Sequence, residues 1–330
     1  MVIKVQIEKQ IAMKQDLRSK FSDSSRGVYL FGTTPPKAGT TPEATAEIAE
    51  KLLQRLEHVD FDGLIVYDIQ DESSRIDKPR PFPYMQTLDP RAYSKLIREK
   101  AEKPVITYKS VSQRDAASFT QWLDEAWNEY GVRDTVLVGS PSSDGDIQLS
   151  LNDAYDVMKD HPADFQLGGV TIAERHAVKG NEHERLMTKS DQGCEFFVSQ
   201  AVYNAQATID MLSSYARKCR EQGVEPKRVI LTFTPCGSTK TLEFMEWLGI
   251  SVPEATRFRI MDARQPLQES IRICRSNLEQ ILEAVVPLNI PIGLNIESLT
   301  NRKEEIEASI RMFKLLKSIV DLRLAEADLV

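Results

Sequence analysis

The sequence predicts a single (β/α)₈ barrel, a closed ring of eight parallel strands surrounded by helices. Short apolar runs alternate along the chain with longer segments of helical periodicity, which is typical of a parallel sheet built from βα units. Eight such runs occur, and no Ser/Gly-rich linker divides the chain into halves. Eight repeats without a linker favour closure into a barrel over an open, doubly wound sheet.

The eight expected strands are short and mostly apolar. They are Gly27–Gly32, Gly63–Asp68, Pro104–Tyr108, Thr135–Gly139, Gly168–Ile172, Phe196–Gln200, Arg228–Phe233 and Pro291–Ile296. The helical patterns between and after them are Pro42–Leu56, Pro90–Lys100, Ala116–Glu129, Leu151–Lys159, Glu182–Gln192, Ala205–Gln222, Thr239–Leu248 and Arg302–Ile319. Each strand is therefore expected to be followed by a helix.

Two segments fall outside this repeat. Residues 1–25 alternate charged and apolar side chains, as a leading surface helix does, and residues 253–289 form a helical insertion before the eighth strand, with a long helix at Gln265–Ala284. The insertion is either decoration or an oligomer surface. The chain of 330 residues suits one barrel domain with these additions, since a barrel typically needs about 250 residues.

The composition bounds the class of function. Hydrophobic residues at 41% and charged residues at 28% are ordinary for a globular protein. A net charge of −7 without a Lys/Arg block argues against nucleic-acid binding and favours small-molecule partners. No apolar run reaches the ~18 residues of a membrane span. The four cysteines form no C-x-x-C pair, so a cytoplasmic location is expected.

Polar residues follow several of the expected strands, at the face where barrel enzymes carry their sites. They are Asp68, Asp71 and Glu72 after the second strand, Gly139 and Ser140 after the fourth, Glu174 and His176 after the fifth, Gln200 at the end of the sixth, and Asn295 and Glu297 at the end of the eighth. Polar groups at buried strand ends need hydrogen-bond partners, which a bound polar ligand supplies. The expected substrate-binding set is Glu174, Gln200, Asn295 and Glu297, with His176 facing the same cavity.

The acidic cluster after the second strand suits general acid/base chemistry or a metal, although such residues also serve as helix caps and solvated charges. The loop that begins at Gly139 and Ser140 suits a phosphate through its backbone N–H groups. His176 and His183 are seven residues apart with a turn between them. That spacing does not match compact metal ligands, and no metal is predicted.

These strand ends together resemble the methylenetetrahydrofolate reductase family, flavin-dependent (β/α)₈ barrels that reduce a folate-bound methylene group to methyl. The resemblance rests on Pro35-Pro36, the Gly139 loop, Glu174-Arg175-His176, and the run from Arg185 to Gln200 that includes Lys189, Asp191 and Gly193. That run is similar to the family's LKxKxDAGAxFxITQ segment and is the most specific part of the match.

The resemblance implies an oxidoreductase acting on a CH–NH group, with FAD as cofactor, NADH or NADPH as electron donor and a folate as substrate. It implies that Gln200 contacts substrate or nicotinamide, and that Lys189 contacts the flavin diphosphate. It also implies flavin contacts for His176 and for the loop of Gly139 and Ser140.

The sequence departs from the family at two acidic positions. Gly32 stands where the family has a glutamate that assists protonation of the folate, and Gly139-Ser140 stands where the family has Gly-Asp. Asp68 or Glu72 is expected to supply the missing acid, because both follow the second strand on the same barrel face as Gly32. The expected catalytic residues are therefore Asp68, Glu72 and Gln200.

Three hypotheses of function remain. The first is the folate-linked, flavin-dependent oxidoreductase. The second is a flavin-free barrel that uses the folate-shaped pocket for one-carbon transfer. The third is a non-catalytic subunit that binds a folate or another ligand, and flavin absorbance of the purified protein separates the first from the other two.

Overall fold

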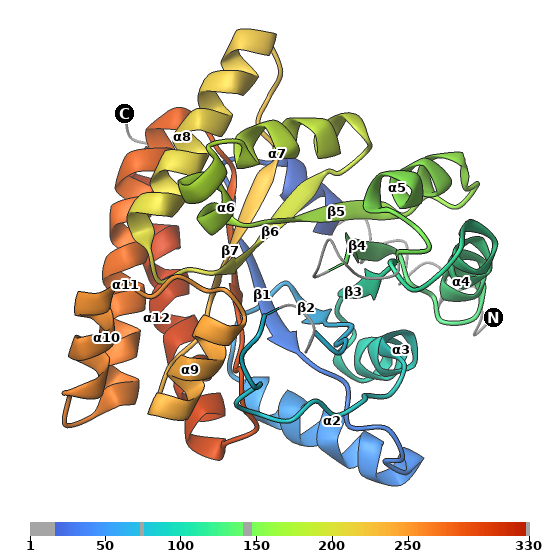
Figure 1. Cartoon of the computed structure of the whole chain (residues 1–330), viewed down its shortest axis with the longest axis horizontal. Helices are drawn as coiled ribbons and strands as arrows, with labels where there is room; N and C mark the ends of the chain where they lie inside the picture. Colours follow the sequence, from blue (N-terminus) through green and yellow to red (C-terminus); the bar gives the residue numbers. More distant parts are fainter. Residues whose placement is uncertain (1–16, 73–75, 141–146, 328–330) are drawn as a thin grey trace.

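Eight parallel strands close into a barrel in the computed structural model, which describes residues 17–72, 76–140 and 147–327 (Figure 1). The strands are β1 (Val28–Thr33), β2 (Gly63–Val66), β3 (Val105–Ser110), β4 (Asp134–Val138), β5 (Gln166–Thr171), β6 (Phe196–Ala201), β7 (Arg228–Phe233) and β8 (Ile292–Ile296). Each strand pairs with the next in the chain, and β8 closes the ring on β1 with Asn295 opposite Leu30. The predicted (β/α)₈ fold is confirmed, with strand ends that differ by at most two residues.

The helices form the outer layer. They are α2 (Pro42–Leu56), α3 (Pro90–Ala101), α4 (Ala116–Asn128), α5 (Leu151–Asp160), α6 (Ala173–Lys179), α7 (Glu182–Asp191), α8 (Ala205–Gln222), α9 (Thr239–Trp247), α10 (Glu254–Met261), α11 (Pro266–Val285) and α12 (Lys303–Ala327), with a 3₁₀ turn at Val286–Leu288. Most begin at a side chain that accepts a hydrogen bond from the first turn. These capping residues are Thr41, Asp89, Asp115, Ser150, Asn204 and Ser238.

The long helix of the predicted insertion is part of the outer ring of helices and not an addition to it. The long helix α11 packs against both α8 and α12, and the three lie together at the left of Figure 1. That is the position of the seventh helix of the ring, so α9 and α10 are the additions and α11 is part of the barrel. Its apolar face is buried, including Ile273, Leu278 and Ile281.

The helical residues 17–22 close the barrel interior at the end where the strands begin, which we call its lower end. The ring of Phe21 stacks on that of Phe196 with centroids 4.3 Å apart. Gly168 makes room for this stack, because a Cβ there would lie 2.4 Å from the Phe196 ring. Beside the stack, the fully buried Arg228 donates to the carbonyl oxygens of Phe21, 3.1 Å, and Ile292, 2.6 Å.

The polar end of the barrel is therefore the opposite one, where the strands finish. Above the apolar layer of Leu30, Ile65 and Ile230, the interior positions become Tyr67, Tyr108, Thr232 and Asn295. None of the described helices combines the length and hydropathy that crossing a membrane requires.

Candidate functional site

A hydrogen-bonded group fills the centre of the barrel mouth. Asn295 is fully buried, and its Nδ2 donates to the Tyr67 hydroxyl at 2.8 Å and to Thr232 Oγ1 at 3.2 Å. Its Oδ1 is buried and accepts no hydrogen bond from the described residues. A buried acceptor without a donor costs about 1–3 kcal/mol, so this atom suits a ligand that carries an N–H group.

Glu297, one residue beyond β8, lies beside Tyr67 and is the acidic group of the mouth. Burial raises the pKa of the Glu297 carboxyl to about 7, and a hydrogen bond with Tyr67 offsets part of that rise. Burial and the Glu297 charge raise the pKa of Tyr67 well above its ordinary value, so the phenol remains neutral. Glu297 therefore changes its charge near neutral pH, as acid/base and binding groups in enzyme sites commonly do.

Gly32, the residue at the position of the missing acid, faces the same group. A Cβ at Gly32 would lie 2.9 Å from Tyr67 Cε2, 3.0 Å from its hydroxyl and 3.1 Å from Glu297 Cβ. The space of the absent β1 side chain is thus occupied by Tyr67 and Glu297. The acidic residue among these closest neighbours is Glu297, which follows β8.

Replacing Gly32 by alanine should destabilise the protein by about 1–3 kcal/mol, because the extra methyl group forces Tyr67 or Glu297 to move. Chemical denaturation of both proteins measures the loss. Gly139→Ala is the matched control, since its Cβ would meet Leu151 Cβ at an ordinary 3.4 Å. Equal stability of the two variants would contradict the crowding of Gly32.

Asp68, predicted as catalytic, is fully engaged by donors. Its Oδ2 accepts from Lys109 Nζ at 3.0 Å and from the Ser110 backbone N–H at 2.9 Å. Its Oδ1 accepts from Gln70 Nε2 at 2.7 Å. Lys109, Ser110 and Gln70 thus hold the carboxylate of Asp68 beside the mouth, and its role as the replacement acid stays a prediction.

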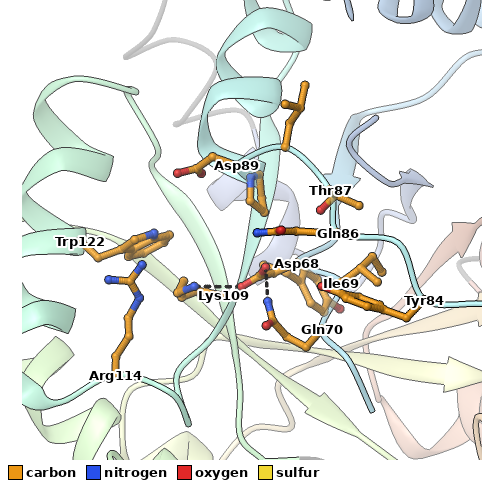
Figure 2. A pocket seen from close by; sticks show the side chains of 13 residues that line it. Asp68, Ile69, Gln70, Tyr84, Gln86, Thr87, Asp89, Lys109, Arg114 and Trp122 are labelled. Atoms are coloured by element: carbon orange, nitrogen blue, oxygen red, sulfur yellow. Dashed lines mark hydrogen bonds and ion pairs between the residues drawn. The ribbon is translucent and has the colours of Figure 1, made fainter. Parts of the chain in front are cut away.

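A pocket of about 260 Å³ opens next to this ion pair. Figure 2 shows Lys109 and Gln70 both reaching Asp68, with Arg114 and Trp122 on one side of the pocket and Tyr84 on the other. The full lining is Asp68, Ile69, Gln70, Tyr84, Gln86, Thr87, Leu88, Asp89, Pro90, Tyr108, Lys109, Arg114 and Trp122. Burial lowers the pKa of Lys109, and the charge of Asp68 opposes that change.

The pocket is connected to the barrel mouth through two tyrosines. Tyr108 lines the pocket, and its ring packs edge-on against Tyr67 with centroids 4.8 Å apart. Tyr67 in turn bonds to Asn295. The mouth and the pocket therefore share one aromatic wall.

Glu174 and Gln200 both contact the segment after α9 and not the group around Asn295. Gln200 Nε2 donates to the carbonyl of Leu248 at 2.7 Å, and Glu174 Oε1 accepts from the Ser251 N–H at 3.1 Å. Both atoms belong to the segment after α9. The pairing of β6 with β7 shifts register between Val198 and Ala201, which interrupts the inward-outward alternation before Gln200.

His176 faces the helix layer instead of the expected cavity. It lies in α6, where its Nε2 is 3.4 Å from Ser214 Oγ of α8 and its ring packs against that of His183. Two helix positions turn the chain by about 200°, so His176 cannot share the direction of Glu174. Within the described ranges, no three His, Cys, Asp or Glu side chains gather in a metal-binding arrangement.

Lys189 is buried behind the barrel wall. Its ammonium group donates to the carbonyl of Val170, and its stem packs over Gly169. Burial lowers its pKa to about 8. The ammonium group predicted to contact a flavin diphosphate thus lies between α7 and β5, where it binds a backbone carbonyl.

The remaining predicted residues lie apart from these groups. Gly139 follows β4 and is covered by Leu151 of α5, and Ser140 is the last described residue before 141–146. The rest of that expected phosphate loop, through Ser143, lies outside the described residues. Glu72 lies near Arg80 in the loop after β2. Its charge opposes the lowering of the pKa of Arg80 by burial.

The sequence analysis missed the aromatic and cationic part of the site. Tyr67 and Tyr108 lie one residue before the predicted end of strand two and at the predicted end of strand three, and inward-outward alternation is the signal that points to both. Arg114 and Trp122 come from the loop after β3 and from α4. Their convergence on the pocket has no signal in the sequence.

The fold and this geometry define a (β/α)₈ barrel whose polar side chains gather at the C-terminal ends of its strands. No family model and no curated protein matches the chain. An uncharacterized protein from Clostridium thermocellum, described as binding two copies of 5-methyl-5,6,7,8-tetrahydrofolic acid, is 37% identical with a TM-score of 0.79. The match covers 92% of this chain and 99% of that one, so the chain belongs to the same family.

More distant structures share only coarse similarity. A putative lyase/mutase from Burkholderia cenocepacia is 15% identical with a TM-score of 0.45, over 74% of this chain and 81% of that one. Dihydropteroate synthase from Xanthomonas albilineans is 12% identical with a TM-score of 0.41, over 90% and 94%. With TM-scores below one half, neither bears on function.

Proposed function

We propose that this chain binds a reduced folate at the mouth of its barrel, with the pterin ring over Tyr67 and Glu297. The observation that carries the proposal is the family relationship, because the relative that matches nearly its whole length is described as binding 5-methyltetrahydrofolate. The chemistry of the mouth supports it independently.

A pterin ring presents several N–H donors along its aminopyrimidinone edge, and the mouth offers acceptors. The buried Oδ1 of Asn295 accepts no hydrogen bond from the described residues, and the Glu297 carboxyl group shares Tyr67 as a hydrogen-bond partner with Asn295. A carboxylate that accepts from two adjacent N–H groups forms a strong, charge-assisted interaction. In this proposal Glu297 holds the pterin edge and Tyr67 supports the ring.

For the reaction class, we favour flavin-free one-carbon transfer by a divergent relative of the methylenetetrahydrofolate reductases. The family segment from Arg185 to Gln200 forms α7, a turn and β6, which agrees with the helix and strand that the resemblance requires. The residues expected to hold FAD do not fit that group. Lys189 is buried and donates to the Val170 carbonyl between α7 and β5, and His176 contacts Ser214 of α8.

The second candidate is the flavin-dependent reduction of methylenetetrahydrofolate, with FAD and with NADH or NADPH as donor. The observation that favours it is again the segment from Arg185 to Gln200. Because the flavin residues do not converge, no step is assigned to a flavin.

The test is direct binding of 5-methyltetrahydrofolate to the purified protein, measured by calorimetry, together with its visible absorbance spectrum. We expect saturable binding and no flavin absorbance. Protein that is yellow as purified and oxidises NADH or NADPH in the presence of methylenetetrahydrofolate would favour the second candidate. Absence of folate binding would contradict both.

A further inference from the structure

The pocket beside Asp68 has the size and chemistry of a subsite for part of a larger ligand. Its volume of about 260 Å³ is below the roughly 300–1,000 Å³ of sites that enclose a drug-sized molecule. This volume suits one aromatic ring with a short polar extension, and the pocket adjoins the mouth through Tyr108, whose ring packs against Tyr67.

The two acids of the lining are already neutralised. Asp68 is paired with Lys109 at 3.0 Å. Asp89 accepts from the side chain of Arg91 at 2.7 Å and caps α3. Neither carboxylate therefore offers the pocket an uncompensated negative charge.

The cations of the lining keep donors for a ligand. An ammonium group has three N–H donors, and Lys109 uses one on Asp68. In the described part of the chain, the Arg114 guanidinium makes one hydrogen bond, a long one of 3.4 Å to the carbonyl of Ser118. Arg114 and Lys109 thus bring unused N–H donors to the side of the pocket that carries Trp122 (Figure 2).

We propose that this pocket binds the benzoyl-glutamate tail of the folate whose pterin lies at the mouth, with the tail carboxylates on Arg114 and Lys109. The inference rests on the proposed function and adds the direction of the tail. The pterin lies over Tyr67, the aromatic ring of the tail passes Tyr108 toward Trp122, and the glutamate reaches the cations. Planar guanidinium groups suit carboxylates, and aromatic walls suit the benzoyl ring.

The test compares three ligands on the wild type, Arg114→Gln and Arg217→Gln. The ligands are 5-methyltetrahydrofolate, 6-methyltetrahydropterin, which has the ring without the tail, and p-aminobenzoyl-glutamate, which has the tail without the ring. Arg217 is the matched control because it is 80% exposed on α8, and the same charge is removed there.

We expect Arg114→Gln to weaken the binding of 5-methyltetrahydrofolate by about 10- to 100-fold. The affinity for 6-methyltetrahydropterin should not change. Arg217→Gln should behave as the wild type, and p-aminobenzoyl-glutamate should compete with 5-methyltetrahydrofolate at one molecule per chain.

Two results would overturn the tail subsite while folate binding stands. One is equal affinity of the wild type and Arg114→Gln for 5-methyltetrahydrofolate. The other is simultaneous binding of p-aminobenzoyl-glutamate and 5-methyltetrahydrofolate, which would make the pocket a separate site. A wild type that binds neither 5-methyltetrahydrofolate nor 6-methyltetrahydropterin would overturn the proposed function itself.

Discussion

Glu297→Gln should weaken the binding of 5-methyltetrahydrofolate by about 10- to 100-fold, the effect of losing a charge-assisted hydrogen bond. An amide offers the pterin edge one acceptor and one donor, whereas the carboxylate offers acceptors only. Titration calorimetry measures the change. Glu174→Gln is the matched control, because burial also raises the pKa of Glu174, which contacts Ser251 away from Tyr67.

The pH dependence of this effect follows from the pKa of Glu297, which burial raises to about 7. The proposed contact needs the ionised form, so wild-type affinity should rise between about pH 6 and pH 8 and then level off. The Gln variant should show no such rise. Wild-type affinity that falls over this range would instead make the protonated carboxyl the binding form.

The same pKa has a consequence for the protein without ligand. The carboxyl pKa is higher in the folded protein than in the unfolded chain. The unfolding free energy is therefore highest below the ordinary glutamate pKa, and it falls as pH rises from that value to about 7. Glu297→Gln avoids the buried charge. Above pH 7 the variant should therefore exceed the wild type in unfolding free energy by about 3 kcal/mol, since burial raises the carboxyl pKa from the ordinary 4.5 to about 7.

Arg228→Met should destabilise the protein by about 3–5 kcal/mol, because it removes the donor that holds the lower end of the barrel together. The guanidinium is fully buried and donates to the carbonyl oxygens of Lys20, Phe21, Asp23 and Ile292. Lys20 and Phe21 belong to the helical residues 17–22 that close the barrel, and Asp23 follows them directly. Methionine fills the volume but leaves buried carbonyls without a donor.

The comparison variant is Arg98→Met. Arg98 is 9% exposed and donates to one carbonyl, that of Tyr130, at 2.6 Å. Its loss should cost less, about 1–2 kcal/mol. Urea denaturation of both variants provides the comparison. A loss of stability in Arg228→Met no greater than that in Arg98→Met would show that the packing of residues 17–22 against the barrel does not depend on Arg228.

Most of the barrel could be predicted because its signals are local. The periodicity of an apolar strand such as β7, or of a capped helix such as α2 or α8, can be recognised within that one segment. All three elements have the predicted bounds. The short helix α6 was missed because it follows β5 directly, without a capping side chain.

The site was predicted only in part, because the direction in which a side chain points depends on segments that are distant in the sequence. The sequence indicated that Asn295 and Glu297 stand at the end of β8, and the structure brings both to Tyr67. It could not indicate that Gln200 turns toward Leu248, since that depends on how β6 pairs with β7.

The sequence by itself determined the order of strands and helices and the face on which polar side chains gather, because hydrophobic periodicity and strand ends are properties of single segments. Only the tertiary structure decided what stands in the space beside Gly32. That space is filled by Tyr67 of one strand end and Glu297 of another, and Arg114 reaches the neighbouring pocket from a third. Closure of the barrel brings these distant segments together, and their burial sets the charge of Glu297.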